Sequence, residues 1–389
     1  MSLTVRAYNV LFGDCILLSW DEDDGRHHAW VDFGNLLDDP NLLFDTVYDD
    51  VLARTGGRLD LALVTHRHLD HLEGFYACRQ RFARDFQVDR LWHAHVTPAL
   101  DNVFRLADQA MTALLPRATV SGEGELGRLY RNNHELTTMD RMAEILRSFP
   151  AASAHAIHRR LDLRAERALP PGMRRMRIQV LAPEEDSGRY LRPLEEGLAS
   201  RQALQRSFDA LPAGASRPAI QPRQPYPQDP GYLFLPELAD FERLRRRLRT
   251  GGLETLAAVD KTRNNTSVVT RWTYDQTISL LLTGDAELTS WSIMDGNGVD
   301  FSADLLKVGH HGSINASPTW SFERVFPQVR GSNAVLLSTD STRFTGEHEV
   351  PKDSVVDGWR ARVTRTSRFR RTDAPGLAPG LSVAFRFGS

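Results

Sequence analysis

The chain has 389 residues, of which 41% are hydrophobic, and is therefore long enough to bury a large core. Its 48 basic and 50 acidic side chains nearly cancel, so the net charge of −2 excludes any argument from overall charge for binding nucleic acid or an anionic membrane. Two cysteines, Cys15 and Cys78, lie in apolar stretches, which predicts reduced core thiols and a cytoplasmic protein. No stretch predicts a membrane span or a secretory signal, and the composition leaves the oligomeric state open.

The N-terminal part of the chain alternates between strand-like and helix-like patterns. The expected strands cover residues 3–10, 15–20, 29–31 and 61–64, and an amphipathic helix is expected over 42–53. Gly13-Asp14 predicts a hairpin between the first two strands. Asp32 ends the third strand and, taken alone, is better explained as a turn residue than as part of a site. The strand–helix–strand order predicts an α/β fold with its chemistry at the carboxyl ends of the strands.

Three histidines and an aspartate follow the strand at residues 61–64 within a few positions. They are His66, His68, Asp70 and His71. Side chains alternate in extended chain, so His66 and His68 can point the same way, and Asp70 and His71 follow on the next turn. Imidazole and carboxylate are ligands of zinc, manganese and iron, so this pattern predicts a site for a divalent metal without thiol ligands.

The middle of the chain interrupts this pattern. A helix is expected over 74–84 and a strand over 90–96, where His93 and His95 have no acidic partner after them and are better explained as strand-edge residues than as ligands. Residues 98–175 predict a helical elaboration, and its isolated histidines predict no site.

A further strand is expected at 176–183, followed by an insertion over 184–259. Its prolines at 211–236 exclude regular secondary structure and favour an ordered excursion or a flap. The arginine run at 241–249 is better explained as a solvated helix face than as a phosphate contact. This insertion is the expected contact for any partner protein.

The C-terminal part returns to strands that end on polar residues. Strands are expected over 264–272, 277–282, 303–308 and 335–338, a short helix over 354–360, and an alternating tail over 380–387 that closes a second sheet. Gly284-Asp285 ends one of these strands and His310-His311-Gly312-Ser313 ends the next. Small residues around the histidine pair leave space for a metal and a substrate.

The order of these strand-end motifs resembles the metallo-β-lactamase fold. Four stretches are similar to the soluble hydrolase domain of ComEC-type DNA-uptake proteins: Gly13-Asp14-Cys15, the run 264–269, the run 281–285, and the run 306–313. The resemblance spans the chain except for residues 98–175 and 184–259. It implies one domain over residues 1–389, built as a four-layer αβ/βα sandwich of two mixed sheets with the metals at one edge.

The resemblance also implies a ligand set of two divalent ions, zinc or manganese. His66, His68 and a third histidine would hold the first ion, Asp70, His71 and His310 would hold the second, and Asp285 would bridge them. This chain departs from the family where it has Asn264 and Asn265 in place of the third histidine. Either an asparagine replaces that ligand or the first site is the weaker one.

These residues predict a metal-dependent hydrolase that activates a water molecule. Asp70 would orient the water, His311 or His348 would protonate the leaving oxygen, and Asp32 would accept a hydrogen bond from a ligand histidine. Ser313 and Lys307 are expected to contact the substrate.

The branch resemblance favours a phosphodiesterase or nuclease acting on nucleic acid or nucleotides. Two alternatives stay open: a lactonase or β-lactam hydrolase, and a non-catalytic interaction module that the metal stabilises.

Overall fold

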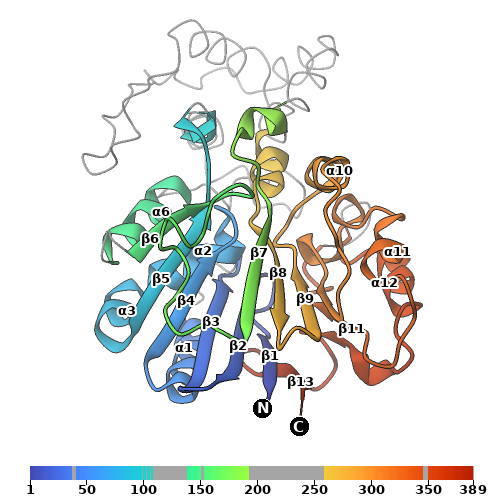
Figure 1. Cartoon of the computed structure of the whole chain (residues 1–389), viewed down its shortest axis with the longest axis horizontal. Coiled ribbons are helices and arrows are strands. Elements are labelled where there is room, and N and C mark those ends of the chain that lie inside the picture. Colours follow the sequence, from blue (N-terminus) through green and yellow to red (C-terminus); the bar gives the residue numbers. More distant parts are fainter. Residues whose placement is uncertain are drawn as a thin grey trace, which may run out of the picture. The chain divides into compact units, whose positions relative to one another are not determined.

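The structure is a computed structural model that describes residues 1–36, 41–98, 100–101, 103–105, 107, 138–149, 153–191, 258–344 and 349–388. The chain divides into two compact units: Met1–His95, Arg141–Glu185 and Asn264–Ser389 form the first, and Val96–Asp140 and Asp186–Arg263 form the second (Figure 1). Residues 141–175, expected in the helical elaboration, thus belong to the first unit. The proline-rich stretch 211–236 and the arginine run 241–249 lie outside the described residues.

The first sheet contains seven strands in the order β13-β1-β2-β3-β4-β5-β6. The expected hairpin is confirmed, because β1 and β2 pair antiparallel. β3 is antiparallel to β2, whereas β3, β4, β5 and β6 run parallel to one another, so the sheet is mixed. The strands are β1 Leu3–Tyr8, β2 Cys15–Glu22, β3 Gly25–Phe33, β4 Arg58–Val64, β5 Gln87–Ala94, β6 Ala154–Ile157 and β13 Ser382–Phe387.

The second sheet contains six strands in the order β12-β11-β10-β9-β8-β7 and is also mixed. Its strands β9 to β12 are parallel, and β7 and β8 are antiparallel to their neighbours. The strands are β7 Met176–Ala182, β8 Val269–Tyr274, β9 Ile278–Leu282, β10 Leu305–Lys307, β11 Ala334–Leu337 and β12 Phe369–Arg371.

Three expected elements differ from the structure. The tail was expected in the second sheet, but β13 pairs with β1 at the edge of the first, with Leu3 opposite Phe387. The strand expected from residue 264 begins only at Val269, because residues 258–265 are helical. The single helix expected over 74–84 is two helices, α2 Leu69–Ala77 and α3 Arg79–Asp85, which meet at Cys78.

The helices pack on the outer face of each sheet. Apolar side chains of the first group of helices join those of β3 and β4 in one core, and those of the second group join β9 to β11 in another. The first group is α1 Asn41–Thr55, α2, α3 and α6 Thr138–Arg147, and the second is α10 Leu288–Gly296, α11 Ser321–Val325 and α12 Asp353–Arg360. Short 3-10 turns cover Ser187–Leu191, His310–Gly312, Ile314–Ala316 and Thr366–Arg368.

A third core lies between the two sheets and holds them together. It contains Trp20 of β2 and Trp272 of β8, whose ring centroids lie 6.2 Å apart, both fully buried. Burial of such a side chain stabilises a fold by about 2–3 kcal/mol. The expected α/β class is therefore confirmed, with two mixed sheets in an arrangement compatible with a two-sheet sandwich.

Two predictions made from composition can also be compared with the described residues. Cys15 and Cys78 are buried free thiols. Within the described ranges, none of the helices has the length and apolar character that crossing a lipid bilayer requires.

In the second unit, the described contacts join distant parts of the chain. The backbone N–H of Thr97 donates to Ser187 Oγ (3.1 Å), and Arg263 Nη2 donates to the Phe104 carbonyl (3.0 Å).

Candidate metal centre

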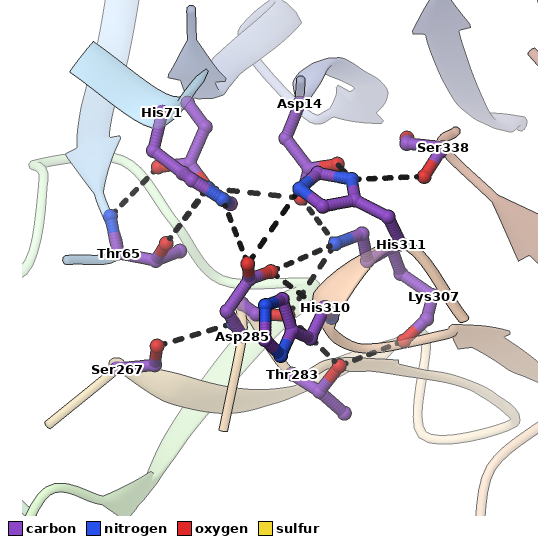
Figure 2. A network of polar contacts seen from close by, with 12 residues as sticks. Asp14, Thr65, His71, Ser267, Thr283, Asp285, Lys307, His310, His311 and Ser338 are labelled. Carbon is purple, nitrogen blue, oxygen red and sulfur yellow. Dashed lines mark hydrogen bonds and ion pairs between the residues drawn. The ribbon is translucent and has the colours of Figure 1, made fainter. Parts of the chain in front are cut away.

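The polar centre of the first unit lies where strands of both sheets reach their carboxyl ends. β4 leads into His66, His68, Asp70 and His71, β9 leads into Asp285, and β10 leads into His310 and His311. Parallel strands of one sheet end at the same edge, which brings Asp285 beside the histidine pair (Figure 2). The loop between β1 and β2 adds Asp14, and the end of β3 adds Asp32.

Four buried residues form a group with the chemistry and spacing of a metal site. Asp70, His71, Asp285 and His311 each offer one ligand atom, and these atoms all lie within 4.8 Å of one another. We call these four residues the Asp285 group. Asp285 Oδ2 lies 3.3 Å from His71 Nε2 and 3.6 Å from His311 Nε2, and Asp70 Oδ2 lies 3.0 Å from His311 Nε2.

Several atoms of the Asp285 group are buried without a hydrogen bond. They are Asp70 Oδ1, His71 Nε2 and Asp285 Oδ2. A buried polar atom without a hydrogen bond costs about 1–3 kcal/mol. His71 Nε2 and Asp285 Oδ2 form an ion pair at 3.3 Å, so Asp70 Oδ1 is the atom that most needs an explanation. A divalent cation would bond to all three, and two imidazoles with two carboxylates are a suitable donor set for zinc or manganese.

Both imidazoles of the group are oriented by a hydrogen bond on the opposite side of the ring. His71 Nδ1 donates to Asp32 Oδ2 (2.8 Å), and His311 Nδ1 donates to the Ser338 carbonyl (3.0 Å). Each Nε2 therefore faces the carboxylates of the centre, where either a second ring proton or a cation must lie between them. Asp32 is itself held by the backbone N–H and the hydroxyl of Thr65, at 2.7 and 2.8 Å.

The charges of the centre shift several pKa values strongly. Burial lowers the pKa of His71, but the carboxylates of Asp285 and Asp32 outweigh it and raise this pKa well above its usual value. Burial likewise opposes ionisation of Asp285, yet His71 and His311 hold its pKa well below the usual range. His66 differs, because burial and then His71 and His68 lower its pKa well below the usual value.

A second buried group shares His71 with the first. Asp14, Asp32 and His71 also bring three possible ligand atoms within 4.8 Å of one another, and we call them the Asp14 group. Lys307 forms an ion pair with Asp14, and its ammonium lies 3.7 Å from Asp285 Oδ1 (Figure 2). Lys307 was expected to contact the substrate, but only 1% of it is exposed, so its ammonium serves these carboxylates instead.

The two histidines after β10 have positions opposite to those expected. His311 was expected as a proton donor and lies among the ligand residues, whereas His310 was expected as a ligand and directs Nδ1 toward Glu287 Oε1, at 3.1 Å. His66 Nε2 and His68 Nδ1 lie 3.0 Å apart beside the Asp285 group. In the part of the chain that the structure describes, no group of three possible ligand residues includes His66, His68 or His310.

The asparagines at the position of the family's third histidine contact the start of α10. Asn264 Nδ2 donates to Glu287 Oε1 (2.8 Å), and the backbone N–H of Ser290 donates to Asn265 Oδ1 (2.9 Å). Asn265 therefore satisfies a free N–H of the first turn of the helix. A ligand role for either asparagine stays a prediction.

The backbone around the centre is unusual in ways that bring the groups together. Asp32, His310 and His311 have φ angles of 54°, 45° and 51°, which side chains rarely adopt and which cluster at functional sites. A Cβ at Gly34 would overlap the backbone of Leu69 and Asp70. Glycine at this position thus allows the end of β3 to approach the start of α2 closely, with Asp32 beside His71.

The remaining expected site residues are less central. Ser313 is half-buried and donates its backbone N–H to the His310 carbonyl (2.8 Å), while His348 lies outside the described residues. Two residues were missed from the expected site, Asp14 and Glu287. The Gly13-Asp14 pair of the first hairpin could have indicated Asp14 as a site residue. Glu287 had only its position two residues after Asp285 to indicate it.

Comparison with known proteins adds no further assignment. A scan against protein-family models and a search of curated proteins both find no match to this chain.

Proposed function

We propose that this chain is a metal-dependent hydrolase with a metallo-β-lactamase fold, and that it cleaves phosphodiester bonds in nucleic acid or nucleotides. The observation that carries the proposal is the Asp285 group, in which two imidazole nitrogens and two carboxylates converge while three of their atoms have no hydrogen bond. Two mixed sheets with these residues at their strand ends support the fold assignment. The substrate class rests on the resemblance to the DNA-uptake hydrolase domain.

The residues have distinct roles in this proposal. One divalent ion would be held by the Asp285 group. A second ion would have His66 and His68 among its ligands. When bound, such ions supply a water molecule of lowered pKa and stabilise negative charge on a phosphoryl oxygen. Asp32 and the Ser338 carbonyl keep both ligand imidazoles in the tautomer that directs Nε2 inward.

We assign protonation of the leaving oxygen to His310 in place of His311. His311 is engaged with Asp70 and Ser338, whereas His310 is the most exposed histidine of the centre at 9% and pairs with Glu287. His310 is therefore the better placed of the two to reach a substrate.

The test combines metal analysis with hydrolysis assays on the full chain. We expect bound zinc or manganese, and cleavage of single-stranded DNA, duplex DNA, RNA or a cyclic dinucleotide that stops on chelation and is lost in Asp70→Ala. A chain that binds metal and cleaves a lactone or β-lactam ring but no phosphodiester would refute the substrate class. A chain without bound metal would refute the proposal itself.

One observation favours a second candidate, a non-catalytic module that the metal stabilises. All four residues of the Asp285 group are at most 5% exposed, as is typical of closed structural metal sites. Metal that raises the unfolding temperature without supporting turnover of any tested ester would favour this candidate.

A further inference from the structure

The two acidic groups of the centre differ in the cation available to them. Both groups contain buried atoms without a hydrogen bond, but Asp14 forms an ion pair with the ammonium of Lys307, which lies 3.7 Å from Asp285 Oδ1. Lys307 is buried and belongs to β10, so the sheet fixes the start of its side chain. Figure 2 shows it reaching the space between Asp14 and Asp285.

The ammonium forms ion pairs with two carboxylates and donates one hydrogen bond to a backbone carbonyl. Its partners are the Asp14 carboxylate, the Gly284 carbonyl at 3.3 Å and Asp285 Oδ1 at 3.7 Å. Three oxygen atoms around a buried positive charge form the environment that a metal ion would otherwise need. A divalent ion bound to Asp14 would lie close to the ammonium, and like charges in a buried site repel strongly.

The tautomer of His71 gives a second reason why the Asp14 group is less suited than the Asp285 group to bind a metal ion. His71 can join this group only through Nδ1, which donates to Asp32 and lies 3.8 Å from Asp14 Oδ2. A metal on Nδ1 would displace that proton and break the hydrogen bond that directs Nε2 into the Asp285 group. An extra ion in the Asp14 group would therefore have to bind through the carboxylates of Asp14 and Asp32, without His71.

We propose that the Lys307 ammonium is a permanent internal cation that takes the place of a metal ion in the Asp14 group, so that divalent ions bind only on the Asp285 side of the centre. Lys307 is a positioning residue in this account and not a substrate contact. The inference rests on the metal-binding part of the proposed function and is independent of the substrate.

The same ammonium controls which oxygen of Asp285 is available. Oδ1 accepts the backbone N–H of His310 (3.0 Å) and lies near the ammonium, whereas Oδ2 points to His71 and His311 and has no hydrogen bond. Lys307 thus helps to fix the side-chain conformation of Asp285 that directs Oδ2 toward His71 and His311, where a metal would bind. Its loss would both free Asp14 and loosen Asp285.

The experiment compares Lys307→Met with Lys307→Arg in the full chain. Methionine removes the charge at similar length, and arginine retains it. After dialysis against Mn²⁺, elemental analysis of the Met variant should give one more ion per chain than the wild type, and the Arg variant should give the wild-type number. The double variant Lys307→Met/Asp14→Asn lacks the carboxylate and should gain no ion.

Thermal unfolding with and without EDTA gives a second readout, since the Met variant should depend on Mn²⁺ for stability more than the Arg variant does. A folded Met variant with the wild-type ion count overturns the inference. So does a Met variant that stays unfolded at saturating Mn²⁺, because the ion must be able to replace the ammonium. A wild-type chain that binds no metal contradicts the proposed function instead, so the two failures are distinguishable.

Discussion

Histidines follow neighbouring parallel strands of the first sheet in two places, after β4 and at the end of β5 and β6, but their surroundings differ. His71, after β4, lies between the carboxylates of Asp32 and Asp285. His95 and His158, after β5 and β6, face each other with ring centroids 5.0 Å apart, and the carboxylate that acts on both, Glu185, is exposed. Within the described ranges, neither of them belongs to a group of three possible ligand residues.

The difference shows that strand-end histidines alone do not form a metal centre. The β4 set contributes Asp70 and His71 to one possible ligand group with Asp285 and His311, which follow β9 and β10. Glu185, which acts on His95 and His158, follows β7 of the same second sheet. The carboxylates raise the pKa of His71, whereas burial and then Arg67 lower the pKa of His93 to about 3. The surroundings of His71 therefore favour a positive charge on or beside its ring, whereas those of His93 favour the neutral ring.

The largest effect should come from removing the shared imidazole. We expect His71→Ala to lower metal affinity by at least about 100-fold, because it removes a ligand and the imidazole that lies between the carboxylates of Asp32 and Asp285. The matched control is His95→Ala, which should leave metal affinity within about twofold of the wild type because the other region has no ligand group. Isothermal titration with zinc measures both, and equal losses would contradict the contrast between the regions.

A smaller effect is expected from the carboxylate behind the ligand. Asp32→Asn retains the shape of the side chain but weakens the hydrogen bond that orients His71, and should reduce metal affinity by about 10–100-fold. Competition with a chromogenic chelator would measure the loss. An affinity equal to that of the wild type would mean that the His71 tautomer does not depend on Asp32.

The smallest effect concerns acid stability, where the two regions should respond with opposite sign. His93 has a lowered pKa, so its contribution is complete above pH 6.5 and is lost as the pH falls toward 3, by roughly 5 kcal/mol or less. In metal-free protein, His71 has a raised pKa, so its contribution is complete at low pH and is lost as the pH rises through that pKa.

Urea unfolding between pH 4 and 8 tests this, and the free energy of unfolding of His93→Gln should decrease less on acidification than that of the wild type. Parallel curves for the two proteins would show that His93 does not titrate with unfolding.

Much of the fold could be predicted because its signals are local. Apolar runs predicted β2, β4 and β9, and apolar spacing predicted α1. The partner of β13 could not be predicted, since alternation in residues 382–387 indicates a strand but contains no information on which sheet edge it joins. The helix at 258–265 was missed because Asn264 and Asn265 favour turns, and their contacts with α10 lie far away in the sequence.

The candidate site was predictable as a set of residues more than as an arrangement. Spacing predicted Asp70 and His71, and the resemblance implied Asp285. The choice between His310 and His311 depends on backbone angles of 45° and 51° that no pattern indicates. The burial of Lys307 was not expected, because lysine is almost never fully buried unless it is paired. Its burial follows from Asp14, which is almost three hundred positions earlier in the chain.

The pairing of β1 with β13 has a consequence for how the centre is assembled during synthesis. Leu3 is translated before every ligand residue, but its partner Phe387 is translated only after all of them. Until then β1 is an unprotected sheet edge, and the loop that carries Asp14 is attached to a strand with one neighbour instead of two. A ribosome stalled before residue 382 would therefore hold a nascent chain with all its ligand residues and an unfinished sheet.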